Sequence, residues 1–113
     1  MAEEREPLVA VAPIVRRNVR TREFRYLYGE LPPRIQVLGL KTYELFLENS
    51  RHPSLALHAL KDNTKGSHKD GSFAVSITMR YRAIYFVDGD VNVWYWVGSH
   101  ADYDRFTGAK RGH

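Results

Sequence analysis

Hydrophobic positions in the first half of the chain follow the period of an α-helix. Between residues 21 and 31 apolar side chains recur at spacings of three and four, and Thr21 is a suitable N-cap. Pro32-Pro33 ends this helix and opens a second one, whose apolar positions run through residues 35–46. The pattern therefore predicts a helical hairpin with a proline corner.

In the second half the period changes to two, which is typical of β-strands. Residues 72–79 alternate, Arg80-Tyr81 is expected to form a corner, and residues 82–87 follow as a second strand. Asp88-Gly89 is a strong hairpin signal. Residues 91–97 (VNVWYWV) are apolar on both faces, so we expect a central strand that is covered on both sides. Its Trp94 and Trp96 are expected to share one face.

Other segments carry weaker signals. Residues 14–20 are expected to form a first strand, residues 55–61 a short one, residues 62–71 a mobile polar loop, and the C-terminus a short helix. Together these elements predict an α+β protein with two layers, an antiparallel sheet of about four to five strands packed on the N-terminal helical hairpin. We expect a flexible arm over residues 1–12, a single domain over 13–107 and a flexible tail over 108–113.

Composition narrows the class of protein. At 113 residues the chain fits one domain, and without cysteine it has no disulfides, zinc ribbons or thiol nucleophiles. No apolar run is long enough for a membrane helix, and the charged N-terminus lacks the order of a signal peptide, so we expect a cytoplasmic location. A net charge of +4 favours an anionic partner such as nucleic acid, the ribosome or an acidic protein segment.

The last predicted strand leads directly into residues 99–104 (SHADYD), which places a histidine, two aspartates and a tyrosine at the edge of the sheet. Imidazole titrates near neutrality, so His100 suits acid or base chemistry. The five histidines form no ligand pattern, and we expect neither a metal nor another cofactor.

The order of elements and several motifs resemble the RelE/ParE toxin superfamily of type II toxin–antitoxin systems. The matching segments are residues 24–32 (FRYLYGELP), 49–55 (NSRHPSL), 58–61 (HALK), 73–85 (FAVSITMRYRAIY) and 93–104 (VWYWVGSHADYD). The resemblance implies a small toxin that is bound by a cognate antitoxin across the helical hairpin and the sheet. It also implies action on translation or on DNA gyrase.

The resemblance further implies roles for individual residues. In the RNA-cleaving branch, His100 stands for the group after the last strand, and Arg82 for the arginine of the penultimate strand. Tyr103 and Lys61 complete the implied catalytic set. Where family members usually carry a basic residue in the third strand, this chain has Ser76, and Arg80 is expected to reach the same space. The other expected RNA-binding residues are Lys65, Lys69 and Asp102.

Such a site would cut RNA without metal, using the 2′-hydroxyl of the substrate as nucleophile. We therefore expect an endoribonuclease that cleaves mRNA, on the ribosome, and inhibits translation. Three other functions remain open: a non-catalytic ParE-like gyrase poison, a degenerate family member that only binds its partner, and a generic RNA-binding module.

Structural roles also remain open for the implied catalytic residues. His100 can cap the last helix, and Arg82 can pair with Asp90 or Asp102. Lys61 can be a solvated surface lysine, and Tyr103 can close the edge of the core.

Overall fold

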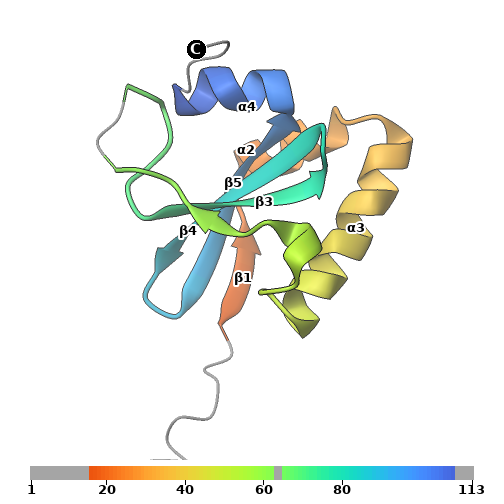
Figure 1. The fold of residues 1–113 in the computed structure, drawn as a ribbon, viewed down its shortest axis with the longest axis horizontal. Coiled ribbons are helices and arrows are strands. Elements are labelled where there is room, and N and C mark those ends of the chain that lie inside the picture. Colours follow the sequence, from red (N-terminus) through yellow and green to blue (C-terminus); the bar gives the residue numbers. More distant parts are fainter. Residues whose placement is uncertain (1–15, 63–64, 109–113) are drawn as a thin grey trace, which may run out of the picture.

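The computed structural model describes residues 16–62 and 65–108. These residues form three α-helices, one short 3-10 helix and five strands (Figure 1). Their order along the chain is β1 (Arg17–Arg20), α2 (Arg22–Gly29), α3 (Pro33–Glu48), η2 (Pro53–Leu55), β2 (His58–Ala59), β3 (Ser72–Thr78), β4 (Tyr81–Asp88), β5 (Val91–Ser99) and α4 (His100–Thr107). The arm predicted over residues 1–12 and the tail beyond Gly108 lie outside the described residues.

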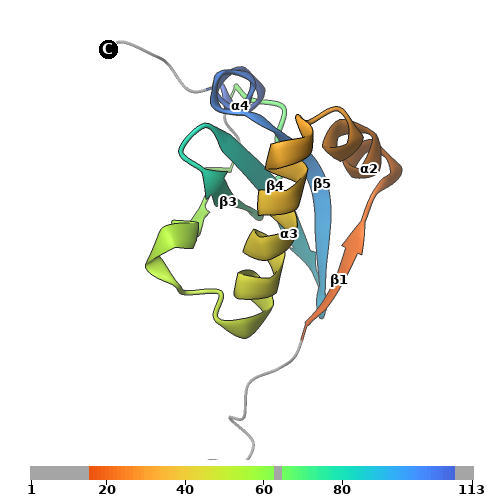
Figure 2. The same cartoon turned by 90° about the vertical axis from the view of Figure 1, so that its right-hand side faces the viewer.

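The predicted helical hairpin is confirmed. The Thr21 hydroxyl accepts a hydrogen bond of 3.0 Å from the backbone N–H of Phe24 and so caps α2. Pro33 occupies the first turn of α3, where its missing N–H leaves no intrahelical bond unmade. Figure 2 shows α3 lying in front of the sheet with α2 beside it.

The sheet has five strands in the order β1-β5-β4-β3-β2. All neighbouring strands run antiparallel except β1 and β5, which are parallel. The predicted α+β architecture is confirmed, but the sheet is mixed rather than purely antiparallel. The long connection through both helices and three strands allows β5 to return beside β1 in the same direction.

A β-bulge in β5 changes the expected distribution of its aromatic side chains. Ile84 pairs with Trp96 and the next residue, Tyr85, pairs with Trp94, so Tyr95 is an extra residue on its strand. The bulge sends Trp94 to the hairpin side, 5.2 Å from the Phe46 ring. Trp96 belongs to the other side, so the expectation that both tryptophans share a face is wrong.

Hydrophobic side chains are buried on both faces of the sheet. One cluster fills the space under the hairpin, and a second lies under α4, where Trp96 stacks on Phe106 with ring centroids 5.0 Å apart. The expected central position of β5, covered on both sides, is therefore confirmed. The buried members of the second cluster are Ala74, Ile84, Tyr95, Trp96 and Tyr103.

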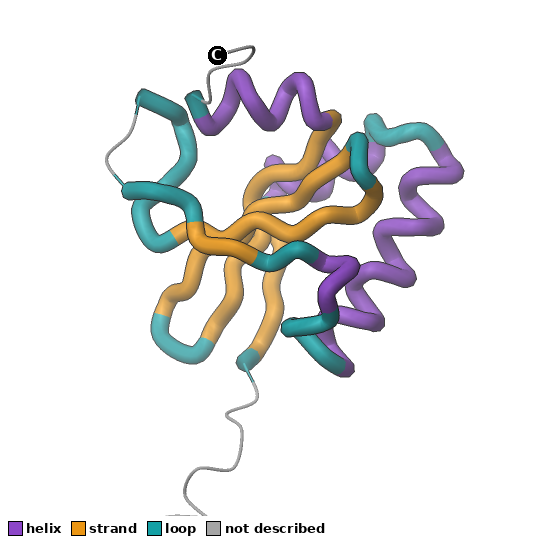
Figure 3. Tube along the Cα trace, viewed as in Figure 1, coloured by secondary structure: helices purple, strands orange, loops and turns teal. Residues whose placement is uncertain are grey.

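The segment between α3 and β3 departs most from expectation. Where one strand over residues 55–61 was expected, the chain forms the short helix η2 and then a strand of two residues, β2 (Figure 3). Ala56 adopts a left-handed conformation with φ of 48°, which interrupts any extended run. The two tight turns lie one residue from their expected places, at Met79-Arg80 and at Gly89-Asp90.

Candidate functional site

Polar groups gather on the face of the sheet that α4 covers, at the end where β5 finishes. Ser76, Arg82 and Gly98 are aligned across β3, β4 and β5 in one row of cross-strand neighbours. Gly98 provides room, because a Cβ atom there would lie 2.8 Å from the Trp96 ring. Figure 1 shows α4 crossing this end of the sheet.

Arg82 lies between a hydroxyl and an aromatic ring. Its Nη1 donates a hydrogen bond of 2.5 Å to Ser76 Oγ, and its guanidinium carbon lies 5.3 Å from the centre of the Tyr103 ring. This is a cation–π contact. Asp102, one of the two acids considered as a partner for Arg82, forms its ion pair with Arg105 instead. The Nε atom of Arg82 is buried and has no hydrogen-bond partner among residues 16–62 and 65–108.

Tyr103 connects Arg82 to a histidine. Its hydroxyl lies 3.3 Å from His58 Nε2, and His58 Nδ1 lies 2.9 Å from the carbonyl oxygen of Ala56. A carbonyl can only accept, so His58 carries its proton on Nδ1, and Nε2 accepts from the tyrosine. Burial raises the pKa of Tyr103, and the nearby Arg82 partly offsets this rise. The phenol is therefore neutral and able to donate.

His100 is the first residue of α4. Its Nδ1 lies 3.5 Å from Oδ2 of Asp104, one turn later, and its side chain is 41% exposed. Its ring centre is 6.1 Å from that of Tyr103. Asp104, and not Asp102, faces the imidazole of His100, and its side chain is the more buried of the two carboxylates.

His58 is the residue of this cluster that sequence reasoning missed. It lies in the matching segment 58–61, but the sequence pattern gives it no role, since it does not show the extent of β2. Its pairing with Ala74 of β3 places it on the α4 face, in the row that continues through Ile84 and Trp96. The register between β2 and β3 is the signal that would have indicated His58, because it fixes the face of the sheet on which each side chain lies.

The basic residues predicted around the site are spread more widely. Lys69 lies over the rings of Phe86 and Tyr95, with Nζ 5.8 and 5.7 Å from their centres. Tyr95 is four residues from Ser99, which is roughly 13 Å along a strand. Lys61 and Lys65 are exposed in the connection between β2 and β3. None of these lysines contacts His58, Arg82, Tyr103 or His100 in the described part of the chain.

Arg80 is also exposed, but it stands next to the cluster. It lies in the turn between β3 and β4, and its carbonyl oxygen accepts a hydrogen bond of 2.6 Å from the backbone N–H of His100. Asp102 is exposed in the first turn of α4, where its backbone N–H donates to the capping hydroxyl of Ser99. The structure brings together His100, Arg82 and Tyr103 and adds His58.

The loop before β3 holds α4 in place. Ser67 donates a hydrogen bond of 2.6 Å from its backbone N–H to the carbonyl of Phe106. Gly66 packs directly on the backbone of Thr107, where no side chain would fit. The loop itself is anchored by the Tyr95 hydroxyl, which accepts from the N–H of Lys69 and lies 2.6 Å from Ser72 Oγ. These contacts fix the helix that carries Tyr103 and His100.

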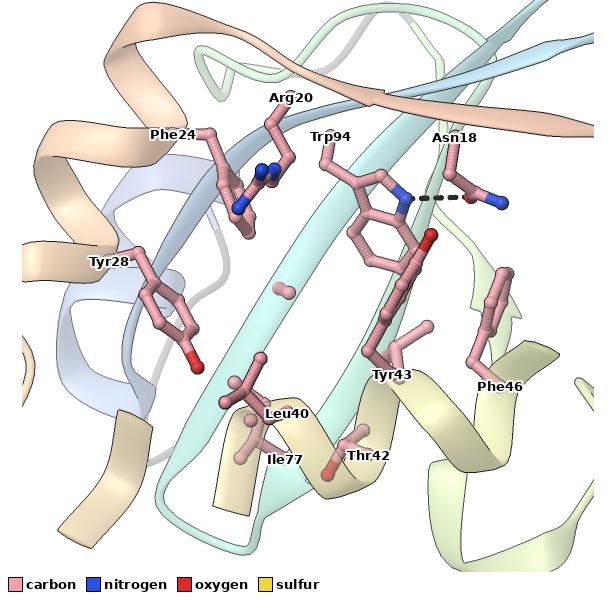
Figure 4. A pocket seen from close by; sticks show the side chains of 13 residues that line it. Asn18, Arg20, Phe24, Tyr28, Leu40, Thr42, Tyr43, Phe46, Ile77 and Trp94 are labelled. Atoms are coloured by element: carbon pink, nitrogen blue, oxygen red, sulfur yellow. Dashed lines mark hydrogen bonds between the residues drawn. The ribbon is translucent and has the colours of Figure 1, made fainter. Parts of the chain in front are cut away.

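A separate apolar groove of about 370 Å³ opens between the hairpin and the opposite face of the sheet (Figure 4). Aromatic rings form much of its wall, and Arg20 and Asn18 stand at its β1 side. Asn18 Oδ1 accepts a hydrogen bond of 2.9 Å from Trp94 Nε1. The aromatic wall residues are Phe24, Tyr28, Tyr43, Phe46 and Trp94.

Comparisons with known proteins were made for sequence and for structure. No protein-family model matches the chain, and no curated protein matches it. Among solved structures, YafQ from E. coli strain BL21(DE3) superimposes with a TM-score of 0.59 at 15% identity, over 78% of this chain and 97% of that one. A chain of the toxin–antitoxin complex RelBE2 from Mycobacterium tuberculosis gives 0.54 at 21% identity, over 77% of this chain and 100% of that one.

The chain has the fold of RelE-like toxins. A chain of the archaeal RelE–RelB complex from Pyrococcus horikoshii also superimposes on it, with a TM-score of 0.56 at 13% identity, over 75% of this chain and 94% of that one. The resemblance to RelE/ParE toxins inferred from the sequence motifs is thereby confirmed at the level of the fold. At these identities the likeness concerns the RelE-like fold alone, so the chemistry must be argued from the side chains.

Proposed function

We propose that this protein is the toxin of a type II toxin–antitoxin pair and acts as a metal-independent endoribonuclease. The observation that carries the proposal is the cluster of His58, Arg82, Tyr103 and His100 on one face of the sheet. Two imidazoles and a guanidinium are the groups that phosphodiester cleavage by a 2′-hydroxyl requires. The fold supports the same function, because the solved structures that share it include chains described as toxins.

The proposed reaction is an internal transfer at phosphorus. His100 accepts the proton of the 2′-hydroxyl, whose oxygen attacks the adjacent phosphorus, and the carboxylate of Asp104 stabilises the imidazolium that forms. The bond from phosphorus to the 5′-oxygen breaks. In the reacting complex His58 carries a second proton, on Nε2, and gives this proton to that leaving oxygen. The Tyr103 hydroxyl, which donates to Nε2 in the free protein, orients the ring before that proton is bound. The products are a 2′,3′-cyclic phosphate and a 5′-hydroxyl.

Arg82 supplies the positive charge for the crowded phosphorane. Its guanidinium is fixed by Ser76 and Tyr103, and only one of its N–H groups is used on Ser76, so the remaining Nη–H groups can donate to a phosphate oxygen. Fixed charges in a partly buried site stabilise a transition state more than mobile ones. Ser76 therefore positions the arginine in place of the basic residue expected at this point of the third strand.

We further propose that the natural substrate is mRNA held by the ribosome. The cluster is small and lies at the edge of the sheet, and the exposed basic side chains around it, Lys61, Lys65 and Arg80, suit an anionic surface. A ribosome that holds the message in a reactive geometry lowers the number of groups that the protein must provide.

The proposed partner is a cognate antitoxin that binds the apolar groove. The groove is open, its wall residue Leu40 is 59% exposed, and further apolar side chains of α3, Val37 and Leu47, are exposed beside it. Exposed apolar surface of this kind marks protein interfaces. The E. coli DinJ–YafQ and P. horikoshii RelE–RelB structures are complexes of this kind of pair.

The nuclease proposal is tested with purified protein, end-labelled single-stranded RNA and excess chelator, with and without ribosomes. We expect products ending in a 2′,3′-cyclic phosphate, and a loss of roughly 10²- to 10⁴-fold in rate for His100→Ala and for His58→Ala. Lys41→Ala, on an exposed position of α3, serves as the matched control. Full activity of both histidine variants would refute the assigned chemistry.

One observation favours a second function, a ParE-like gyrase poison without catalysis. Arg82 is already engaged by Ser76 and Tyr103 in the free protein, so a phosphate has to approach a guanidinium that is partly covered. A poison would leave transcripts whole and accumulate gyrase-linked DNA breaks. Cleavage of purified plasmid by gyrase in the presence of this protein distinguishes the two.

A further inference from the structure

A second hollow, of about 460 Å³, lies along the outer edge of β2. It runs between the turn that follows α3 and the strand itself, and His58 contributes to its lining. Because His58 also contacts Tyr103, this hollow continues the candidate site around the edge of the sheet. Its other lining residues are Ser50, Arg51, His52, Pro53, Ala56, Leu57, Ala59 and Phe73.

The charge of this hollow suits an anion. Its ionisable lining residues are Arg51, His52 and His58, and none of its lining residues in the described part of the chain is acidic. His52 Nδ1 accepts a hydrogen bond of 3.2 Å from the backbone N–H of Ser54, so the neutral ring carries its proton on Nε2. The hollow thus offers a guanidinium and the Nε2–H donor of His52, together with apolar contacts from Leu57 and Phe73.

The turn that carries these donors is fixed by its own hydrogen bonds. Asn49 Oδ1 accepts from the N–H of Arg51 at 3.1 Å, and the Asn49 carbonyl accepts from the N–H of His52 at 3.0 Å. The turn is tied to the core by Leu55, which is 1% exposed. A binding site on a fixed turn loses less conformational entropy when a ligand docks.

We infer that the hollow along β2 is a second nucleotide site. It holds the nucleotide that adjoins the cleaved phosphate, and Arg51 contacts the next phosphate of the RNA. The inference rests on the proposed nuclease function and adds the path of the RNA: across His58 and along the β2 edge. Arg51 is exposed and its planar guanidinium suits a phosphate, while the apolar side chains of the hollow can pack against a base.

The test compares two substrates that differ only in length: a dinucleoside monophosphate, whose single phosphate occupies the cleavage site, and a longer single-stranded RNA. Arg51→Ala is expected to raise KM about tenfold for the longer RNA, as the loss of one charge-assisted hydrogen bond predicts, with kcat unchanged. Cleavage of the dinucleoside monophosphate is expected to stay at the wild-type rate. Arg51→Lys should recover part of the affinity, and Arg34→Ala, exposed on α3, should behave as wild type.

An equal loss on both substrates, or no loss on the longer RNA, would overturn the second site. The experiment distinguishes failure of the second site from failure of the nuclease proposal. If the wild-type protein cleaves no RNA either with or without ribosomes, the nuclease proposal fails, and RNA affinity measured against salt still decides the Arg51 site. Loss of one phosphate contact lowers the slope of log K against log salt by roughly 0.7 for a single strand. An unchanged slope would exclude the contact.

Discussion

At the scale of single residues, Tyr103 connects the candidate site. Its ring lies over Arg82 and its hydroxyl meets His58, and the same residue is buried in the second hydrophobic cluster. Sequence reasoning reached His100 and Tyr103 because they directly follow the last predicted strand, and Arg82 through the resemblance to RelE/ParE toxins. It missed His58, because a strand of two residues leaves no readable period.

Tyr103→Phe separates the ring from the hydroxyl. We expect the variant to fold, because the ring and its packing remain, and to lose about tenfold in kcat of RNA cleavage, equivalent to one hydrogen bond of about 1.4 kcal/mol. KM should change little. Tyr103→Ala should in addition lower the free energy of unfolding by about 3–5 kcal/mol, because it empties part of a core. Undiminished kcat in the phenylalanine variant would contradict the role of the hydroxyl.

Buried tyrosines make stability depend on alkaline pH. Burial raises the pKa of Tyr85 above its ordinary value near 10, so the unfolded chain releases this proton before the folded one does. The folded state then holds more protons, and the free energy of unfolding falls as the pH rises beyond about 10.

Urea unfolding of wild type and Tyr85→Phe at pH 9 and pH 11 checks this prediction. Lysines titrate in the same range, but their contribution is shared by both proteins and cancels in the comparison. We expect the loss of unfolding free energy between the two pH values to be smaller in the variant. Equal losses would show that the phenol of Tyr85 is not desolvated in the folded state.

At the scale of elements, the hairpin helices and β3 could be predicted because each shows its period over seven or more residues. The strands β4 and β5 could be predicted because two apolar runs flank the hairpin signal at Asp88-Gly89. The direction of β1 and the short β2 could not, since four and two residues carry too little pattern. The bulge at Tyr95 was also hidden, because a run that is apolar on both faces shows no break in alternation where an extra residue enters.

Gly98 tests the packing of β5 beneath the site. A Cβ atom at this position would meet the Trp96 ring at 2.8 Å, so Gly98→Ala is expected to lower the free energy of unfolding by about 1–3 kcal/mol. At Gly29, the last residue of α2, nothing lies within 4 Å of an added Cβ atom. Gly29→Ala is therefore the matched control, with an expected gain of about 0.4–1 kcal/mol. Denaturant titration measures both, and a neutral Gly98→Ala would contradict the tight packing.

At the scale of the whole molecule, the two faces of the sheet are suited to different partners. The α4 face carries the ionisable cluster, while the hairpin face carries the apolar groove and the exposed apolar positions of α3. No helix within the described ranges is long and apolar enough to cross a membrane. The separation means that binding in the groove and chemistry under α4 can be altered independently.

Leu40→Glu tests this separation. The side chain is 59% exposed, so we expect little change in the free energy of unfolding, within about 0.5 kcal/mol, and wild-type RNA cleavage. A charge in the apolar groove should instead weaken neutralisation by the antitoxin. Co-expression with the proposed antitoxin, scored by growth, makes the comparison, with Lys41→Glu as the exposed control on the same helix. Full neutralisation of the Leu40 variant would place the antitoxin elsewhere.

The central claim is that the groups under α4 cut RNA. The most direct measurement is to induce the protein without any partner and map transcript 5′ ends in the arrested cells, beside His100→Ala and His58→Ala. We predict cuts within coding sequences, in register with the reading frame, that disappear in both variants while the proteins remain folded. Growth arrest with intact transcripts would contradict the claim and point to a target other than mRNA.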